Sequence, residues 1–519
     1  MATVHSSFRS PGPFAKLVAA FPRPFDNAVA AARSCYSPQI ITEDDVAQSP
    51  SKRDALAQSI YAAGHHTTLQ HAHFQFVLTN VSRQLIWSLL HSHPFYNSEQ
   101  VSQRYVEVRD GAFAVPPLEG EALAIYERSV ARAMEDYHRL VRLLSGPVEA
   151  AYIKRFPARR SSQRARSDIQ RKSQEVARYV LPVATFGHMY HTVSALTLLR
   201  LHRMCRLPDA PTEARLLVAQ MVDEVLRHDP GFKVILEEPL AEDQTLEWAC
   251  VEAPRPPGSL ETMKREFDAS LGGKASRLIS RKPDNESLVA QAVREVLGLP
   301  MSSISDEEAI ACALDPARNR YLGEKLNVAT HSKLMRALHH AAYTFRKRLS
   351  HSADSQNQRH RMTPASRPIL TAHLGDAPDV ITPLLIAAAE GETRACYNTS
   401  MERTWEAIRS LRRLGVPDEF VAYLLPNATV VRLTESTDLL NLHHKLRARL
   451  CYNAQEEIWR ASLDEAEQIA ALEPRIGAFL LPPCGLRARA TITPPCPEGN
   501  RYCGVPVWKL ERSQYERLI

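Results

Sequence analysis

The chain has 519 residues, of which 44% are hydrophobic and 24% charged, as in soluble globular proteins, and its length predicts two domains. The net charge of +6, from 64 basic and 58 acidic residues, fits anionic small-molecule ligands and does not demand nucleic acid. No run of about 18 apolar residues predicts a membrane span, and the N-terminal M-A-T-V-H-S-S does not resemble a signal peptide. Nine scattered cysteines favour reduced thiols, so we expect a cytoplasmic protein.

In chain order, the predicted elements appear twice, beginning each time with a short strand, a turn and an Ala-rich helix. The matching segments are 16–18 and 277–279, 28–33 and 288–294, 71–76 and 340–345, Ser82 and Ser350, and Leu181-Pro182 and Leu425-Pro426. Five matches in the same order predict a tandem duplication. We expect repeats at 1–240 and 274–519, joined by a linker at 241–273 that is rich in Pro and Gly.

Short strands, Ala-rich helices and the duplication together predict an α+β fold. Each copy would be a mostly antiparallel sheet with helices packed on it, and the two copies would form a pseudo-dimer.

A dense polar motif lies in the second repeat, where Ser350 is followed by Gln356 and then by Arg359-His360-Arg361. Guanidinium groups bind phosphate bidentately and an amide reads the edge of a base, so the motif suits a ligand with phosphates and a planar ring. Its spacing, S-x5-Q-x2-R-H-R, resembles the signature of the flavin-dependent thymidylate synthases.

The first repeat holds other parts of that family's signature. It has His91-Ser92-His93 where R-H-R is expected. However, residues 97–105, N-S-E-Q-V-S-Q-R-Y, resemble the family's N-E-x-S-x-R-Y with one extra residue, and 177–182 match A-R-x-x-L-P. Taken singly, the S-Q-R-Y segment could be a capped helix start and Arg178 a surface salt bridge. In order and together, the motifs favour a site.

The second repeat lacks S-x-R-Y and has Ala422 in place of the arginine before Leu-Pro, but it keeps the late motif R-L-C-Y-N-A-Q-E-E-I at 449–458. In the first repeat Cys205 replaces the arginine of that late motif. Because random losses would leave no complete set, these complementary losses predict one retained active site shared by the repeats. Cys205 and Arg367 would line the lost site, and we expect changes there to leave turnover nearly intact.

The resemblance implies roles for residues at matching motif positions. Arg449 would be catalytic, because a guanidinium at the pyrimidine edge stabilises developing negative charge. Substrate binding is implied for Glu99, Ser102, Gln103, Arg104, Arg178, Gln356 and Arg359, and cofactor binding for Thr67, Ser194, Arg359, His360, Arg361 and His444. The family forms homotetramers with sites between subunits, so the resemblance implies a homodimer of this chain that mimics the tetramer.

The activity implied by the resemblance is reductive methylation of dUMP to dTMP, with methylenetetrahydrofolate as carbon donor, FAD as cofactor and NADPH as reductant. Two alternatives stay open: a flavin enzyme that methylates another uracil nucleotide, and a non-catalytic flavin- or nucleotide-binding protein. The family's H-x-T-P-F-E-H is altered at residues 65–71, H-H-T-T-L-Q-H. Asp438 stands where the family prefers Asn near the flavin, and either it points elsewhere or Ser194 supplies that contact.

Two further clusters have other interpretations. A basic stretch before Arg178 is interspersed with Ser, Gln and Asp and predicts a solvated helix face rather than a polyanion site. Its members are Arg155, Arg159, Arg160, Arg164, Arg166, Arg171 and Lys172. Cys484, Cys496 and Cys503, with Cys451 as a fourth thiolate, are candidate zinc ligands, but C-x11-C-x6-C is not the spacing of a standard zinc finger. We therefore expect reduced structural cysteines and no metal.

Overall fold

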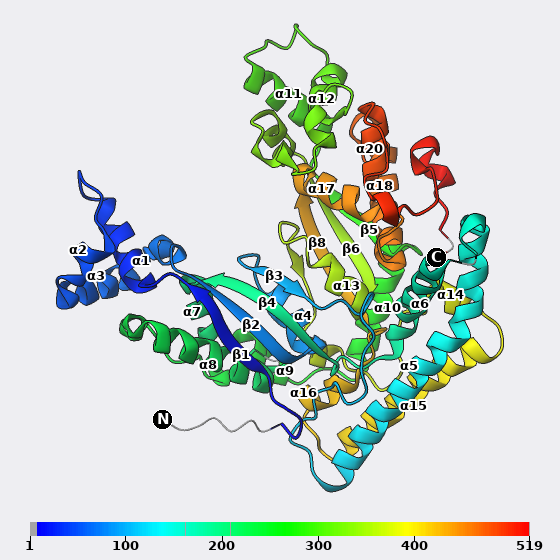
Figure 1. The fold of residues 1–519 in the computed structure, drawn as a ribbon, viewed down its shortest axis with the longest axis horizontal. Helices are drawn as coiled ribbons and strands as arrows, with labels where there is room; N and C mark the ends of the chain where they lie inside the picture. The colour runs from blue at the N-terminus through cyan, green and yellow to red at the C-terminus, as the bar shows by residue number, and fades with distance from the viewer. Residues whose placement is uncertain (1–7, 161, 208, 518) are drawn as a thin grey trace.

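The computed structural model describes residues 8–160, 162–207, 209–517 and 519, so the N-terminal heptapeptide lies outside the described residues. It contains two four-stranded antiparallel sheets, one in each half of the chain (Figure 1). The first has the order β1 (Phe14–Ala20), β2 (His73–Ser82), β4 (Phe186–Ser194), β3 (Asn97–Gln100). The second has the same order in β5 (Ser276–Arg281), β6 (Ala342–Ser350), β8 (Val430–Asp438), β7 (Ala365–Ser366).

Helices occur in equivalent positions around the two sheets. The pairs are α1 (Pro24–Ser34) and α11 (Asn285–Leu297), α4 (Arg83–His91) and α13 (His351–Asn357), α5 (Gly120–Arg155) and α15 (Glu392–Arg413), α7 (Ala195–Arg203) and α17 (Leu439–Arg449), and α8 (Pro211–His228) and α18 (Glu456–Leu472). The remaining helices are α2 (Glu43–Ala47), α3 (Pro50–Ala62), α6 (Gln163–Ala177), α9 (Leu246–Glu252), α10 (Ser259–Leu271), α12 (Asp306–Leu314), α14 (Leu384–Ala387), α16 (Asp418–Val421), α19 (Pro474–Gly477) and α20 (Pro483–Arg489). The predicted α+β fold of two tandem copies is confirmed.

The first strand of each sheet shows how closely the copies agree. β1 has a register shift between Leu17 and Ala19, and β5 has one between Leu278 and Ser280. A bulge is a specific local feature, so its recurrence at the matched leucine supports a common origin of the two sheets.

The two copies meet across a pseudo-twofold axis at the repeated Leu-Pro segment. Val183 N donates to Leu425 O and Asn427 N donates to Leu181 O, both at 2.8 Å. Pro182 and Pro426 form an isolated antiparallel bridge at the same place. Reciprocal contacts of this kind characterise an isologous dimer interface, which here lies within one chain.

A second reciprocal contact joins the sheets through carboxylates. Glu213 accepts from Ser82 N and Oγ and from the Tyr423 hydroxyl, while Glu457 accepts from Ser350 N and Oγ and from the Tyr179 hydroxyl. Each carboxylate therefore ties the end of its own sheet to a tyrosine from the other repeat.

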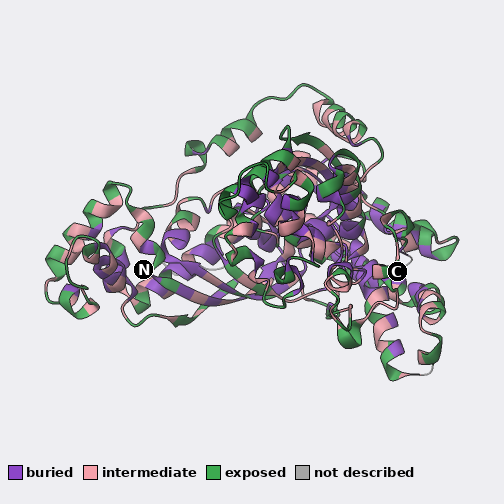
Figure 2. Ribbon diagram, turned by 90° about the horizontal axis from the view of Figure 1, so that it is seen from above, coloured by how far each residue is buried: buried purple, intermediate pink, exposed green. Residues whose placement is uncertain are grey.

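Around this junction, α5 and α15 run side by side at the lower right of Figure 1. Figure 2 shows buried residues concentrated along the strands and at the junction, whereas the outlying helices carry most of the exposed ones. No helix in the described part of the chain is long and apolar enough to span a bilayer. The segment 241–273 contains α9 and α10 rather than irregular chain alone; the domain boundaries themselves stay a prediction.

Candidate functional site

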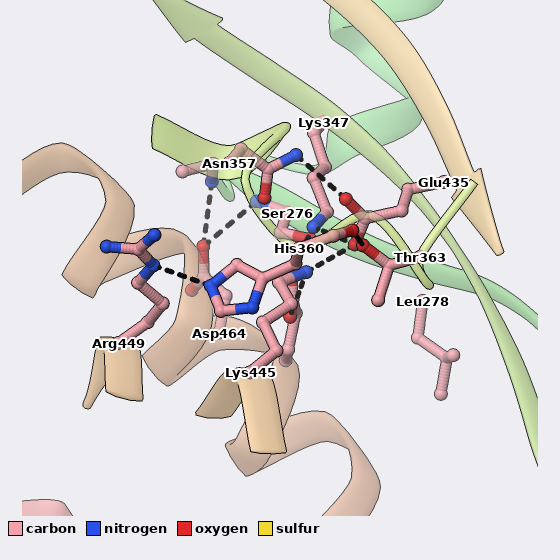
Figure 3. Close-up of polar contacts among 12 residues, drawn as sticks. Ser276, Leu278, Lys347, Asn357, His360, Thr363, Glu435, Lys445, Arg449 and Asp464 are labelled. Carbon is pink, nitrogen blue, oxygen red and sulfur yellow. Dashed lines mark hydrogen bonds and ion pairs between the residues drawn. The ribbon is translucent and has the colours of Figure 1, made fainter. Parts of the chain in front are cut away.

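The R-H-R motif lies in the turn that follows α13. Ser350 caps this helix by accepting from Ala353 N at 3.0 Å. The carbonyl of Gln356 accepts from Arg449 Nη2 at 2.8 Å. Arg449 Nε donates to His360 Nε2 at 2.8 Å, as Figure 3 shows. Burial, followed by the charge of Arg449, holds the pKa of His360 well below its usual value. His360 is therefore a neutral acceptor that orients the Arg449 guanidinium.

Arginines from both repeats lie near Arg449. Burial, with smaller contributions from the charges of Arg359 and Arg104, lowers the pKa of Arg449 to about 10. At neutral pH the side chain stays protonated. The site thus holds a desolvated guanidinium with other cations beside it, which favours an anionic ligand.

Arg104, from the S-Q-R-Y segment of the first repeat, reaches the late motif of the second. Its Nη2 donates to Asn453 O at 2.9 Å, and its Nε lies 3.2 Å from Glu175 Oε1. Lys172 Nζ lies 3.2 Å from the other oxygen of Glu175. The fold therefore brings the S-Q-R-Y segment of the first repeat into contact with the late motif of the second.

Buried positive charge exceeds what Glu175 can balance. Burial alone would raise the pKa of Glu175, but Arg104, Lys172 and Arg178 hold it far below its usual value. Arg178 is only 5% exposed, and its Nε and Nη2 have no hydrogen-bond partner among the described residues. An uncompensated buried charge costs several kcal/mol, so this group, which we call the anion cluster (Arg104, Lys172, Glu175, Arg178 and Arg517), suits a bound phosphate.

Arg517 joins the anion cluster from the C-terminal segment. It is 8% exposed, burial lowers its pKa against the opposing effect of Glu175, and its Nη1 has no partner within the described ranges. Sequence analysis missed Arg517, and it assigned Lys172 to a solvated face. The helical spacing of Lys172, Glu175 and Arg178 could have placed all three on one face of α6 and its extension.

Two amides complete the polar surface near the anion cluster. Gln103 Oε1 accepts from Asn427 Nδ2 at 3.1 Å. The Nε2 groups of Gln103 and Gln356 have no hydrogen-bond partner among the described residues. Ser102 Oγ accepts from Arg104 N at 3.3 Å. Buried N–H donors without partners are expected where a ligand supplies the acceptor.

Strand β3 and the R-H-R turn enclose a hollow of about 280 Å³. Arg359 Nη2 lies 2.7 Å from Glu99 Oε2, and Arg361 donates to Asn97 Oδ1 at 3.3 Å. The Arg361 guanidinium also lies 5.1 Å from the centre of the Tyr96 ring. Contacts from one repeat to the other thus define this second part of the site.

Other predicted cofactor residues are placed differently. His444 has its ring 6.1 Å from that of His360, so it borders the site. Thr67 is exposed in a 3₁₀ turn, and Ser194 caps α7 by accepting from Thr197 N at 3.3 Å. Neither lines the hollows described here. Asp438 caps α17 and lies 3.1 Å from His339, so its carboxylate is already engaged.

On the other side of the pseudo-twofold axis, at the position equivalent to the candidate site, packed side chains occupy the space. Asp354 accepts from Trp87 Nε1 at 2.7 Å and pairs with Arg367 Nε at 2.7 Å. Both Asp354 and the Arg367 side chain are almost fully buried. That changing Arg367 leaves turnover nearly intact stays a prediction, but the pairing gives Arg367 a structural role, because removing it would leave Asp354 unpaired. Cys205, in contrast, lines a mainly apolar hollow of about 440 Å³ with His91 and His93.

A buried network of four charges supports the R-H-R turn. Lys347 and Lys445 both contact Glu435 and Glu465, and all four side chains are 0% exposed (Figure 3). Asn357, just before the turn, donates to Glu435 at 2.8 Å. The alternation of buried residues along β6 could have indicated that Lys347 points inward, but its partners come from distant segments.

The candidate zinc ligands gather in one place. Cys451, Cys484, Cys496 and Cys503 line a single small hollow. Burial and the neighbouring thiols raise the pKa of Cys484 to about 12, so this thiol is neutral. The described residues contain no group of His, Cys, Asp or Glu arranged to hold a metal ion.

Comparisons with known proteins agree with the duplicated fold. The family model described as thymidylate synthase complementing protein matches residues 16–231 and 277–475. A flavin-dependent thymidylate synthase of Clostridium tetani is 29% identical over 221 residues, covering 42% of this chain and 83% of that protein. One from Geobacter sulfurreducens is 27% identical over 230 residues, covering 44% and 92%. Less than half of this chain thus covers most of each relative.

Among solved structures, the chain matches the UMP/dUMP methylase PolB from Streptomyces cacaoi bound with 5-Br dUMP. The match has 18% identity and a TM-score of 0.31, and it covers 44% of this chain and 97% of that one. The family model matches most of the sequence in two successive segments, each containing one sheet. The chain therefore belongs to the thymidylate synthase complementing protein family and carries two copies of its domain.

Proposed function

We propose that the protein is a flavin-dependent methyltransferase that converts dUMP to dTMP at one active site built from both repeats. The observation that carries the proposal is the anion cluster, which adjoins Arg449. Its buried positive charges outnumber the single negative charge of Glu175. Membership of the family supports the reaction type.

In this proposal Arg104 and Arg178 bind the 5′-phosphate of dUMP. Their guanidinium groups are buried, so a charge-assisted hydrogen bond to phosphate is stronger there than at a solvated surface. The partnerless Nε2 groups of Gln103 and Gln356 are suited to donate to the carbonyl oxygens of uracil. Ser102 would bind the phosphate or the base.

Arg449 would stabilise negative charge that develops on the pyrimidine ring. With a pKa of about 10 it stays protonated at neutral pH, so it supplies charge without giving up a proton. His360 accepts from Nε and Gln356 O accepts from Nη2. These two contacts fix the guanidinium before substrate arrives, so little reorganisation is needed during the reaction.

The hollow beside β3 fits a flavin in its chemistry. Arg359 and Arg361 offer cationic donors, Tyr96 offers an aromatic face, and Glu99 and Asn97 offer polar contacts. When bound, FAD would supply the redox chemistry and pass on the one-carbon unit of methylenetetrahydrofolate, with NADPH as the reductant. Thr67 and Ser194 lie away from this hollow. We therefore extend the proposal to a homodimer in which these two residues contact the FAD bound by the partner chain.

The experiment is a spectrum of the purified protein, loaded with FAD, with and without dUMP, combined with rescue of a thymidine auxotroph. We expect a flavin absorption band that shifts on addition of dUMP, and growth without thymidine. A protein that takes up no FAD would refute the proposal. A flavoprotein that is unchanged by dUMP and gives no rescue would favour a binding role without catalysis.

A further inference from the structure

A second, larger hollow opens directly beside the anion cluster. It measures about 790 Å³ and lies between the repeats, with walls from α5, α6 and the C-terminal segment. Arg104, Lys172 and Glu175 form its inner end. The hollow therefore begins where the proposed phosphate site ends.

The walls of this hollow are strongly basic. Seven Arg and Lys side chains line it, against the three side-chain carboxylates of Asp168, Glu175 and Glu498. The seven are Arg104, Arg155, Arg159, Arg164, Arg171, Lys172 and Arg501. Arg155 and Arg501 have no ion-pair partner in the described part of the chain. The basic stretch thus lines an open hollow, where the Arg164 and Arg171 side chains remain 41% and 51% exposed.

An independent observation marks the inner end as unsatisfied. Arg517 is buried close to Arg104 and Glu175, yet its Nη1 has no hydrogen-bond partner among described residues. Arg178, behind Arg104, has two such nitrogens. One phosphate can satisfy these inner groups, and Arg155 and Arg159 line the hollow in addition to them.

The outer walls also contain aromatic rings. Tyr152 and Phe156 line the hollow on one side, and Tyr452 and Tyr502 on the other. The Arg159 guanidinium lies 4.4 Å from the centre of the Phe156 ring. Arginine held against an aromatic face is pre-organised for phosphate, and the space exceeds the needs of a single anion.

We infer that this hollow binds a second phosphate on the 5′ side of the nucleotide. The ligand class that this predicts is a uracil nucleoside 5′-diphosphate, free or esterified at its outer phosphate. The inference rests on the proposed function, because Arg104 is taken to hold the first phosphate. It deepens that function by assigning a second phosphate position beside the one that the phosphate of dUMP would occupy.

The test is calorimetric titration of the FAD-loaded, full-length protein with dUMP and with dUDP. We expect dUDP to bind about tenfold more tightly, since the second phosphate adds charge-assisted hydrogen bonds to the outer arginines. The double variant Arg159→Ala/Arg171→Ala should abolish this preference and leave dUMP affinity unchanged. Arg166→Ala is the matched control, because Arg166 is exposed on the same helix and does not line the hollow.

The outcomes separate the two proposals. If neither nucleotide binds, the proposed function fails together with this inference. If dUMP binds and dUDP binds no better, the inference alone is overturned. A third arm compares monoglutamyl and pentaglutamyl methylenetetrahydrofolate. If the double variant weakens only the longer folate, the hollow holds a carboxylate chain and the nucleotide assignment is wrong.

Discussion

Arg449 and Cys205 occupy equivalent places, at the end of the helix that follows β8 and just after the helix that follows β4. They differ in charge and in surroundings. Arg449 is held by two hydrogen bonds beside other arginines, whereas Cys205 borders a mainly apolar hollow. We predict that Arg449→Ala lowers turnover at least about 100-fold, while Cys205→Ala changes it less than about twofold. Steady-state assays on folded variants measure both.

The same experiment extends to Arg104. Because Arg104 and Arg449 would act on one substrate, the double variant should be no slower than either single variant. Additive losses, or an equally damaged Cys205→Ala, would show that the residues do not form one site.

We expect Lys172 to make the affinity for the proposed nucleotide depend on pH. Burial lowers its pKa to about 8 in spite of Glu175, below its ordinary value of about 10.5. At neutral pH the buried charge on Lys172 thus lowers the free energy of unfolding. That cost disappears as the lysine loses its proton, so stability rises with pH between about 8 and 10.5. Affinity for an anion changes in the opposite direction and falls as pH rises through about 8, because Lys172 loses its positive charge there.

We therefore predict severalfold weaker dUMP binding at pH 9 than at pH 7, measured by calorimetry. The phosphate is already a dianion over this range. Lys172→Arg should keep affinity nearly constant, because arginine stays charged. An identical fall in that variant would assign the pH dependence to another group.

Arg367 has a structural role that motif matching did not predict. Its place in the sequence indicated a residue left over from a lost site, but it pairs with buried Asp354, 13 positions earlier. We predict that Arg367→Ala lowers the free energy of unfolding by about 3–5 kcal/mol. Denaturant titration measures this, with Arg139→Ala, from an exposed pair with Glu392, as a control that should cost under about 1 kcal/mol. A loss as small as the control's would contradict the pairing.

At the scale of elements, Glu213 and Glu457 form a matched pair. Each carboxylate accepts three donors at the end of a sheet, and an amide would turn an N–H toward one of them. We predict that Glu213→Gln and Glu457→Gln each cost about 1–3 kcal/mol of unfolding free energy. Only Glu457→Gln should also weaken dUMP binding, because Ser350 begins the helix that carries Gln356. Equal effects on binding would disprove this asymmetry.

Much of the element pattern could be predicted from sequence. The repeated strand, helix and Leu-Pro segments correctly indicated two α+β copies, because local periodicity is preserved in both. The polarity of the basic stretch did not reveal the hollow it faces, since the opposite wall comes from residues 452–503. The Lys347–Glu435 contact was equally hidden, because it joins strands 88 positions apart.

At the scale of the whole molecule, the fused chain should hold one nucleotide site. One side of the pseudo-twofold axis carries the anion cluster, and the other is closed by Trp87, Asp354 and Arg367. We predict one dUMP per chain at saturation, measured by calorimetry, and a mass of two chains by light scattering. Two dUMP per chain would disprove the filled site, and a monomer would disprove the proposed dimer.

The reciprocal contacts at Leu181 and Leu425 have a consequence for inheritance. In a dimer made from one gene, every substitution appears on both sides of the axis, so an interface change is always doubled. Here the two sides are encoded separately, and a weaker contact on one side can be offset by a change on the other. This freedom lets one side of the axis, built from both repeats, specialise in chemistry while the other side is selected for holding the pair together.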